Sequence, residues 1–306
     1  MRPGWVKTSL VAFSFLLMTT VISASEQGRF EKKLSVSGAA DLEVLTRSGN
    51  VTVHGGPAGS ISIIGRIHVG DRWFNGGRKD DVQAIEQNPP ISQNGNSVRI
   101  DYVNHRDISI DYEVTAPPDT KLRTKSGTGD HTIEGIKAGA NIETGSGDVR
   151  IRDLAGGIRI HTGAGNVRAR GAVGSFEAHA GSGDISLEAN GKGDVRVETG
   201  SGNVELRGVN GGLWASTGSG DVRIDGNPSS SWSVKTGSGN ADIKVPEQAA
   251  FDVDLLTSSG SIVIDQPVTT TVQGRVQEMR KNIRGKVRGG GPEIAVRTGS
   301  GDIRVN

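Results

Sequence analysis

The chain has 306 residues, with 35 Lys and Arg against 34 Asp and Glu, so its formal net charge is only +1. This balance predicts no nucleic-acid partner, because such partners require a strongly basic surface. Cysteine is absent, which excludes disulfides and an N-terminal lipid-modified cysteine. Glycine is abundant at 46 residues and aromatic residues make up 4%. A core must therefore be built from small and β-branched side chains, repeated many times.

The first residues have the pattern of a secretory signal peptide. Two basic residues, Arg2 and Lys7, precede an apolar run over residues 10–22, and small residues follow at 23–25. The run is shorter than the ~20 residues that a membrane-spanning helix needs. We therefore expect residues 1–24 to be removed on export. The mature chain, without a transmembrane anchor, is expected in the periplasm or at the cell surface.

Residues 25–122 are expected to hold N-terminal coils and a capping excursion. Alternating apolar residues over 30–70 predict strands. A short helix is predicted over 80–86, where a Pro-Pro pair follows and stops it. Strands are predicted again over 97–103 and 108–114. We expect the excursion to cover one end of the array that follows, because an open sheet edge invites strand addition.

A sequence repeat dominates residues 123–306. Its unit reads Thr-Gly-Ser-Gly-Asp/Asn, followed by alternating apolar and polar residues. Successive copies begin at 126, 144, 162, 180, 199, 217, 236 and 257, and a further copy begins at 298. The steps from 126 to 236 are 18 or 19 residues and the step from 236 to 257 is 21, and a near-constant period of this length is typical of a solenoid. Each period holds two strand patterns, one before the Thr and one after the Asp/Asn, each with one apolar face.

Two topologies fit two short strands per period. One is a coil that climbs one strand spacing, ~4.8 Å, per turn, and the other is an antiparallel meander of hairpins. We favour the coil, because a single-layer meander leaves its apolar face uncovered. The predicted fold is an all-β, single-stranded parallel β-solenoid with 18–19-residue coils and short capping excursions. We expect the coil to be right-handed.

The last residue of each turn alternates between Asp and Asn. In stacked coils these residues would form one structural column: Asp148, Asn166, Asp184, Asn203, Asp221 and Asn240. A column made of Asp alone would place carboxylates ~4.8 Å apart, where they repel one another. Alternation with Asn removes that repulsion, so it favours stacked coils over a meander.

Three segments together resemble a known family. They are the run that starts at Thr144 (TGSGDVRI), the segment 111–118 (DYEVTAPP) and the segment 289–302 (GGGPEIAVRTGSGD). They are similar to the "putative adhesin", β-strand-repeat domain of unknown function found in exported bacterial proteins. The resemblance covers roughly residues 40–306. It implies a β-solenoid in a cell-envelope setting and brings no catalytic residues with it.

Two features are candidates for ligand contact. Residues 267–292 interrupt the repeat and are predicted to form an irregular basic insertion. Its cations, Arg280, Lys281, Arg284, Lys286 and Arg288, suit an anionic glycan or another envelope component. Trp214 has the outward phase of its strand, where an aromatic ring can stack against a sugar.

The chemistry of other sites is not supported by the pattern. The Gly-x-Gly-Asp turn lacks the residue that separates Gly from Asp in calcium-binding nonapeptide repeats, and half of the turns carry Asn. His161 and His179 share a phase one period apart, without a third metal ligand. We therefore predict no metal, no cofactor and no catalytic residue.

The predicted function is that of a non-enzymatic, adhesin-like binding or structural protein of the cell envelope. The alternative is a scaffold that associates end to end or with a partner chain. A glycan-active β-helix enzyme is disfavoured, because these coils are short and lack the long loops that build a cleft.

Overall fold

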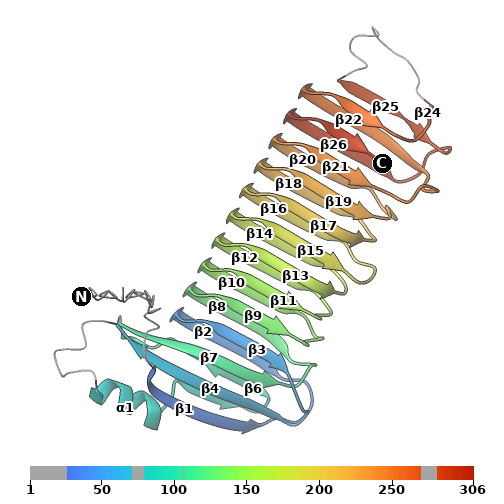
Figure 1. Ribbon diagram of the computed structural model, residues 1–306. Coiled ribbons are helices and arrows are strands. Elements are labelled where there is room, and N and C mark those ends of the chain that lie inside the picture. Colours follow the sequence, from blue (N-terminus) through green and yellow to red (C-terminus); the bar gives the residue numbers. More distant parts are fainter. Residues whose placement is uncertain (1–25, 71–78, 106, 270–280) are drawn as a thin grey trace, which may run out of the picture.

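The computed structural model of the protein describes residues 26–70, 79–105, 107–269 and 281–306; the predicted signal peptide, residues 1–24, lies outside them. These residues form an elongated stack of strands with a cap at each end (Figure 1). Two long sheets run along the stack, sheet A with 13 strands and sheet B with 14. The all-β prediction is confirmed, since α1 (Lys79–Gln87) is the one helix in the described ranges.

Each coil in the middle of the stack gives one strand to each sheet. Sheet B takes β8 (Lys121–Thr128), β10 (Ala140–Ser146), β12 (Ile158–Ala164), β14 (Phe176–Ser182), β16 (Val195–Ser201), β18 (Leu213–Ser219) and β20 (Trp232–Ser238). Sheet A takes β9 (His131–Glu134), β11 (Val149–Arg152), β13 (Val167–Ala172), β15 (Ile185–Ala189), β17 (Val204–Val209), β19 (Val222–Gly226) and β21 (Ala241–Lys244). Neighbouring strands are parallel and in register, so that Ile142 pairs with Ile160 and Ile160 with Ala178. The parallel pairing excludes the meander.

The Thr of each repeat is buried at the corner between the two sheets. From Thr144 onward its hydroxyl donates a hydrogen bond to the carbonyl of the glycine that precedes Asp or Asn in the turn of the neighbouring coil. Thr217 Oγ1, for example, lies 2.9 Å from the Gly202 carbonyl oxygen, and Thr199 Oγ1 lies 2.9 Å from that of Gly183. A buried polar group must be satisfied in this way, which favours Thr at the corner. In one coil the buried Ala180 takes the same position without such a bond.

A ladder of hydrogen bonds follows the Asp/Asn residues of the turns. Each Oδ1 accepts a hydrogen bond from the backbone N–H of the equivalent residue in the next coil. The five links from Asp148 to Asn240 measure 2.8–3.0 Å. Further links run from Asp111 through Asn50 and Asp130 at one end, and through Asp302 to Ser261 at the other. Asp and Asn can both accept this bond, so charge decides between them.

The ladder has one place where two Asp residues are neighbours, Asp130 and Asp148. Arg150 forms ion pairs with both carboxylates, at 2.8 and 2.9 Å. The pKa of Asp148 is lowered first by the hydrogen bond from the Asn166 N–H and further by Arg150 and Arg168. A cation thus compensates where alternation is missing.

Asn203→Asp should keep the hydrogen bond to the Asp221 N–H but place three carboxylates in a row. We expect a loss of stability of about 1 kcal/mol or less per new pair, which grows with Asn166→Asp and falls with added salt and at low pH. Thermal melts of both single variants and the double variant at low and high salt measure this. Equal melts for all of them at low salt would contradict the repulsion argument.

The N-terminal cap differs from the opening coils predicted over 30–70. Only β2 (Asp41–Ser48) and β3 (Val51–Gly55) form a coil there, beside β8 and β9. β1 (Glu26–Ser35), β4 (Ser60–Val69) and β7 (Ile108–Ala116) form an antiparallel layer that continues sheet A, and β5 (Ile91–Asn94) and β6 (Ser97–Ile100) form a hairpin on sheet B.

Helix α1 lies against this cap. Val82 and Ile85 are buried, and Glu86 accepts a hydrogen bond from the Arg29 N–H at 2.8 Å. Phe30 meets Tyr112 edge to face, with ring centroids 6.3 Å apart. β4 pairs antiparallel with both β1 and β7, so the chain folds back on itself here instead of climbing to the next coil, which accounts for the difference from the prediction.

The C-terminal end is not stacked in chain order. β22 (Phe251–Ser259) and β23 (Ile262–Ile264) form the outermost coil, while the later strands β26 (Glu293–Ser300) and β27 (Ile303–Val305) lie between that coil and β20–β21. The predicted irregular insertion at 267–292 contains β24 (Val268–Thr269) and β25 (Asn282–Val287). β25 pairs antiparallel with β22 and buries Val287. The irregular prediction is therefore wrong for these strands, because they cover the edge of sheet B.

Candidate binding groove on sheet B

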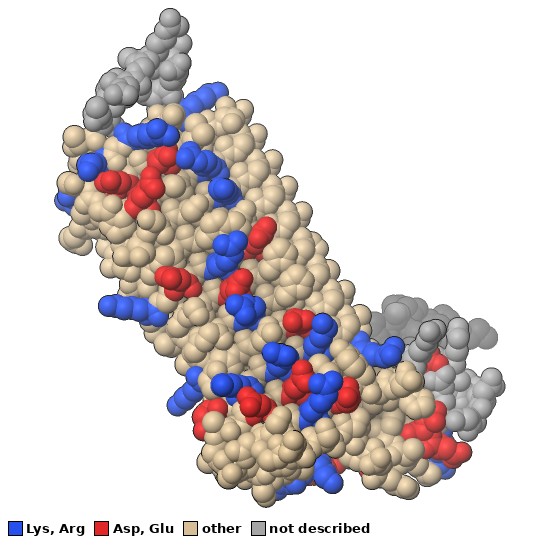
Figure 2. Space-filling view, turned by 180° about the vertical axis from the view of Figure 1, so that it is seen from behind, with Lys and Arg blue, Asp and Glu red and all other residues tan. Residues whose placement is uncertain are grey.

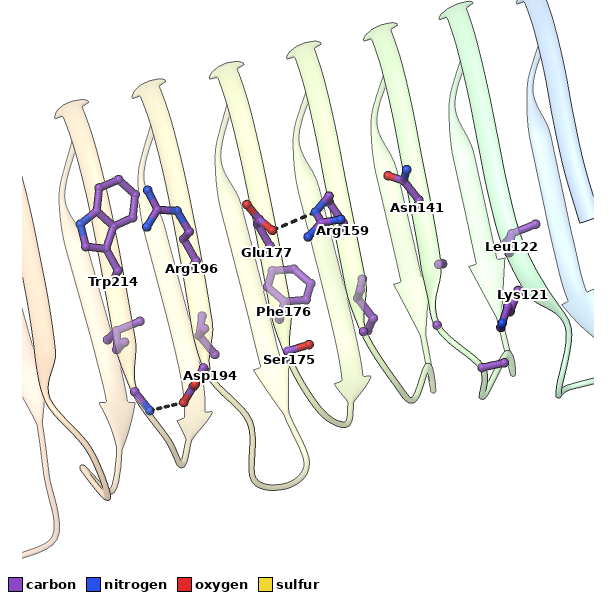
Figure 3. Close-up of a pocket in the computed structure, with 18 residues that line it drawn as sticks. Lys121, Leu122, Asn141, Arg159, Ser175, Phe176, Glu177, Asp194, Arg196 and Trp214 are labelled. Carbon is purple, nitrogen blue, oxygen red and sulfur yellow. Dashed lines mark hydrogen bonds and ion pairs between the residues drawn. The ribbon is translucent and has the colours of Figure 1, made fainter. Parts of the chain in front are cut away.

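A groove of about 670 Å³ crosses the outer face of sheet B from β8 to β18. Its wall is a row of side chains from equivalent positions of five neighbouring strands (Figure 3). In order along the stack they are Asn141, Arg159, Glu177, Arg196 and Trp214. Small residues line the groove beside this row, among them Gly139, Gly157, Ser175 and Gly212. In-register coils thus convert one position of the repeat into a wall that runs along the long axis.

Trp214 is held in place by its neighbour. The guanidinium of Arg196 lies 3.9 Å from the centroid of the indole ring, a cation–π contact. On the other side, the adjacent strand carries only the short Ser233 at the paired position. One face of the ring is therefore engaged, and a small side chain adjoins the other.

Charges of both signs line the groove. Arg159 Nε lies 2.9 Å from Glu177 Oε2, and Asp194 Oδ1 accepts a hydrogen bond from the Gly212 N–H at 2.8 Å. Lys121 adds a further cation. Figure 2 shows the same mixture over the face opposite to that of Figure 1, where basic and acidic side chains are interspersed. The groove thus offers hydrogen-bond donors and acceptors without a strong field of one sign.

Comparison with known protein families shows which family the chain belongs to. The model of the Toastrack DUF4097 family matches residues 13–198 and 93–306. The chain belongs to this family. The resemblance drawn from the repeat is thereby confirmed. No curated protein matches the Toastrack chain.

Several solved structures are similar to this Toastrack chain. A "putative lipid binding protein" from Parabacteroides distasonis is 12% identical with a TM-score of 0.43, covering 92% of this chain and 97% of its own. A "putative adhesin" from Bacteroides fragilis is 12% identical with a TM-score of 0.31, covering 92% and 98%. A "putative cell adhesion protein" from Clostridium sporogenes is 12% identical with a TM-score of 0.24, covering 90% and 98%. Likenesses at this level carry no functional argument.

The basic candidates of the Toastrack chain lie at the C-terminal end of sheet B, apart from Arg280, which is outside the described residues. Arg284 lies opposite Asp254 on the neighbouring strand. The same row of equivalent positions runs on through Ala295 and Ser233 to Trp214, so Arg284 and Trp214 belong to one row. Their contacts are local, however. Arg284 lies 3.1 Å from Asp254, and Lys286 lies 4.0 Å from Asp252.

The other two described cations of this set bind backbone carbonyls. Arg288 Nε donates to the Glu247 carbonyl at 2.8 Å, and Lys281 Nζ donates to that of Ser258 at 2.9 Å. Burial by itself raises the pKa of Asp254, but hydrogen bonds from Arg297 and Arg284 lower it overall. The basic side chains are therefore tied to their own end of the stack and do not converge on one point.

The two predicted outward histidines stack on the same sheet. The rings of His161 and His179 are parallel, with an interplanar angle of 1° and centroids 5.0 Å apart, and His179 Nδ1 lies 3.6 Å from Glu198. No group of three or more metal-ligating side chains occurs in the described part of the chain. Within that part, no helix is long and apolar enough to cross a membrane.

A buried polar cluster was missed by the sequence analysis. His131 is fully buried; its Nδ1 lies 2.9 Å from Thr124 Oγ1 and its Nε2 lies 2.8 Å from Ser126 Oγ. Ser126 in turn donates to Thr144, and Thr144 donates to the Gly129 carbonyl. This chain of donors assigns the imidazole proton to Nε2. The sequence could have revealed this cluster. The positions that hold Ile142, Thr144 and Val149 in one coil hold Thr, Ser and His in the preceding coil, so polar residues replace apolar ones at two inward positions.

Proposed function

We propose that this Toastrack chain is an exported, non-enzymatic binding protein of the cell envelope that holds an extended glycan along sheet B. The observation that carries the proposal is the groove of about 670 Å³, walled by the in-register row that ends at Trp214. The signal-peptide pattern supports export to the periplasm or cell surface. A right-handed solenoid of 18–19-residue coils, with no cofactor, remains part of the proposal.

The shape of the groove favours a linear polymer. It crosses successive strands, so side chains at equivalent positions recur at the strand spacing of ~4.8 Å. A chain of sugar rings presents hydroxyl groups at regular intervals, which can both donate and accept hydrogen bonds. Arg159, Glu177 and Asn141 supply the complementary groups, and the indole of Trp214 supplies a flat apolar face.

The basic residues at the end of the same row extend this proposal. An anionic part of a longer glycan, or another envelope component, is proposed to contact Arg280, Lys281, Arg284, Lys286 and Arg288.

The alternative function, a scaffold that associates end to end, gains less support. Antiparallel strands cap the stack, β1–β4–β7 at one end and β24–β25 on sheet B at the other. These strands interrupt the regular parallel edge of the stack at those two places, while β23 ends sheet A in the described residues.

Trp214→Ala is the decisive variant for the groove. Loss of the stacking surface should weaken glycan binding about tenfold, the factor that corresponds to an aromatic contact of ~1.4 kcal/mol. A glycan array identifies the ligand, and titration of that ligand measures the change. Tyr102→Ala removes an exposed aromatic ring away from the groove and should leave binding unchanged. An array without any bound glycan, or equal affinity for Trp214→Ala and the parent chain, would exclude the groove as the site.

A further inference from the structure

The outer face of sheet A carries two rows of charged side chains, and both rows alternate in sign along most of their length. One row reads Glu134, Arg152, Arg170, Glu188, Arg207, Asp225 and Lys244. The other reads Arg150, Arg168, Ser186, Glu205, Arg223, Asp242 and Arg304. Alternation is broken between β11 and β13 in both rows at once. There Arg150 pairs with Arg168, and Arg152 pairs with Arg170.

These four side chains form what we call the four-arginine patch: Arg150, Arg152, Arg168 and Arg170. Like charges directly opposite one another on adjacent strands are destabilising. No other such pair occurs in these two rows, although every coil has the same freedom to choose its outward residues. In the N-terminal cap Arg29 lies opposite Arg66, but there Glu113 binds Arg66 at 2.7 Å. Two like-charged pairs side by side therefore call for a compensating group of opposite charge.

The protein itself compensates only part of the patch. Arg150 binds Asp130 and Asp148, and Arg168 Nη1 lies 3.4 Å from Asp148 Oδ2. Arg152 has only a distant contact, 3.5 Å from Glu134, and its side chain is 63% exposed. Arg170 has no ion-pair partner within 4.0 Å among residues 26–70, 79–105, 107–269 and 281–306. Arg152 and Arg170 are therefore the two cations available to a ligand.

We propose that the four-arginine patch binds a phosphate group. A guanidinium presents a planar fork of N–H donors that matches an oxyanion, and all four positions carry Arg and none carries Lys. A carboxylate has two oxygens, which a single bidentate Arg occupies. A phosphate monoester carries about −1.5 to −2 charge and three acceptor oxygens, so it can engage Arg152 and Arg170 together.

The surroundings limit the shape of the ligand. Glu134 precedes Arg152 in its row, and Glu188 follows Arg170. A long polyanion that runs along the stack would meet a carboxylate on either side of the patch. The site therefore suits a compact phosphate, either free or at the end of a larger molecule that approaches from solvent. It lies on the opposite sheet from the groove, so it does not depend on the proposed glycan function.

The test compares two double variants of the full chain that remove equal charge from the same face. Arg152→Gln with Arg170→Gln empties the centre of the patch. Arg207→Gln with Arg223→Gln is the control, because these arginines lie opposite acidic residues in their rows. The probes are inorganic phosphate, followed by titration calorimetry, and phosphatidylcholine vesicles with and without phosphatidic acid, followed by co-sedimentation.

We expect the parent chain and the control to bind at least one probe, with affinity that falls as salt rises, and the patch variant to lose at least tenfold. Binding of phosphatidic acid vesicles alone assigns the phosphate to a headgroup, and binding of inorganic phosphate alone assigns it to a soluble ligand. Without phosphate at low salt, the patch variant should melt no lower than the parent, because a repulsive pair is gone. Failure of both probes to bind, or an equal loss in both double variants, would overturn the proposal.

Discussion

Replacing Gly183 with Ala is expected to lower the free energy of unfolding by about 3 kcal/mol or more, from backbone strain plus overpacking. Gly183 has a φ of +129°, and a Cβ at this position would lie 2.2 Å from the Gly165 carbonyl oxygen of the preceding coil. That oxygen belongs to backbone that is fixed by the stack, so it cannot move aside as a flexible side chain can. Chemical denaturation measures the loss.

Gly157→Ala is the matched control for this substitution. A Cβ there meets nothing closer than Ser175 Oγ at 3.5 Å, an ordinary contact distance. We expect a change of about 0.5 kcal/mol or less, typical of an unstrained surface position. If Gly157→Ala and Gly183→Ala destabilised the protein equally, close stacking of the turns could not be the reason for glycine at Gly183.

The second large effect is expected from acid. Burial lowers the pKa of His131 to about 4, from an ordinary value of 6.5. The unfolded chain therefore takes up a proton at a higher pH than the folded chain. Stability is fully present above pH 6.5 and is lost as the pH falls towards 4, by about 3 kcal/mol for a shift of this size. Protonation at Nδ1 also removes the acceptor that Thr124 binds.

A triple variant isolates the His131 contribution. Thr124→Ile, Ser126→Thr and His131→Val restore the residues of the next coil, Ile142, Thr144 and Val149. Replacement of the hydrogen-bonded Thr124 and His131 together by apolar residues is close to neutral at pH 7, and Ser126→Thr keeps a hydroxyl at the corner. Denaturation from pH 7 to 4 should then show the loss in the parent chain but not in the triple variant. A parallel decline in both proteins would assign the acid sensitivity to carboxylates instead.

The repeat predicts the middle of the fold well, because equivalence between positions is a property of the sequence. The inward and outward phases follow from it, and so does the corner position of Thr. Trp214 was placed outward for this reason, and it lines the groove. The groove itself was not predicted. The second Gly-rich turn recurs in the sequence, as at Gly157 and Gly212, but the periodicity alone does not show that these small residues leave a hollow beside the row that ends at Trp214.

The ends of the stack were harder to predict. A period shows which residues are equivalent, but any coil can stack on any other with similar contacts. Long segments at 71–96 and 267–292 release the chain from sequential order, and β26–β27 returns to an inner position. The basic residues were predicted as a solvated insertion, because the partners of Arg284 and Lys286, which are Asp254 and Asp252, are distant in the chain and only the strand pairing of β25 brings them together.

The inner position of the last coil has a mechanical consequence. A force applied at Asn306 acts on β27, which pairs with both β21 and β23, and through it on β26, which pairs with both β20 and β22. If the coils were stacked in chain order, the final coil would contact only one neighbouring coil, and its strands could be pulled away one after the other. Here two interfaces must separate together, while β25 continues to hold the outer coil from its far side. The stack therefore resists extension from this end more strongly than a repeat protein of the same length whose last coil is also its outermost.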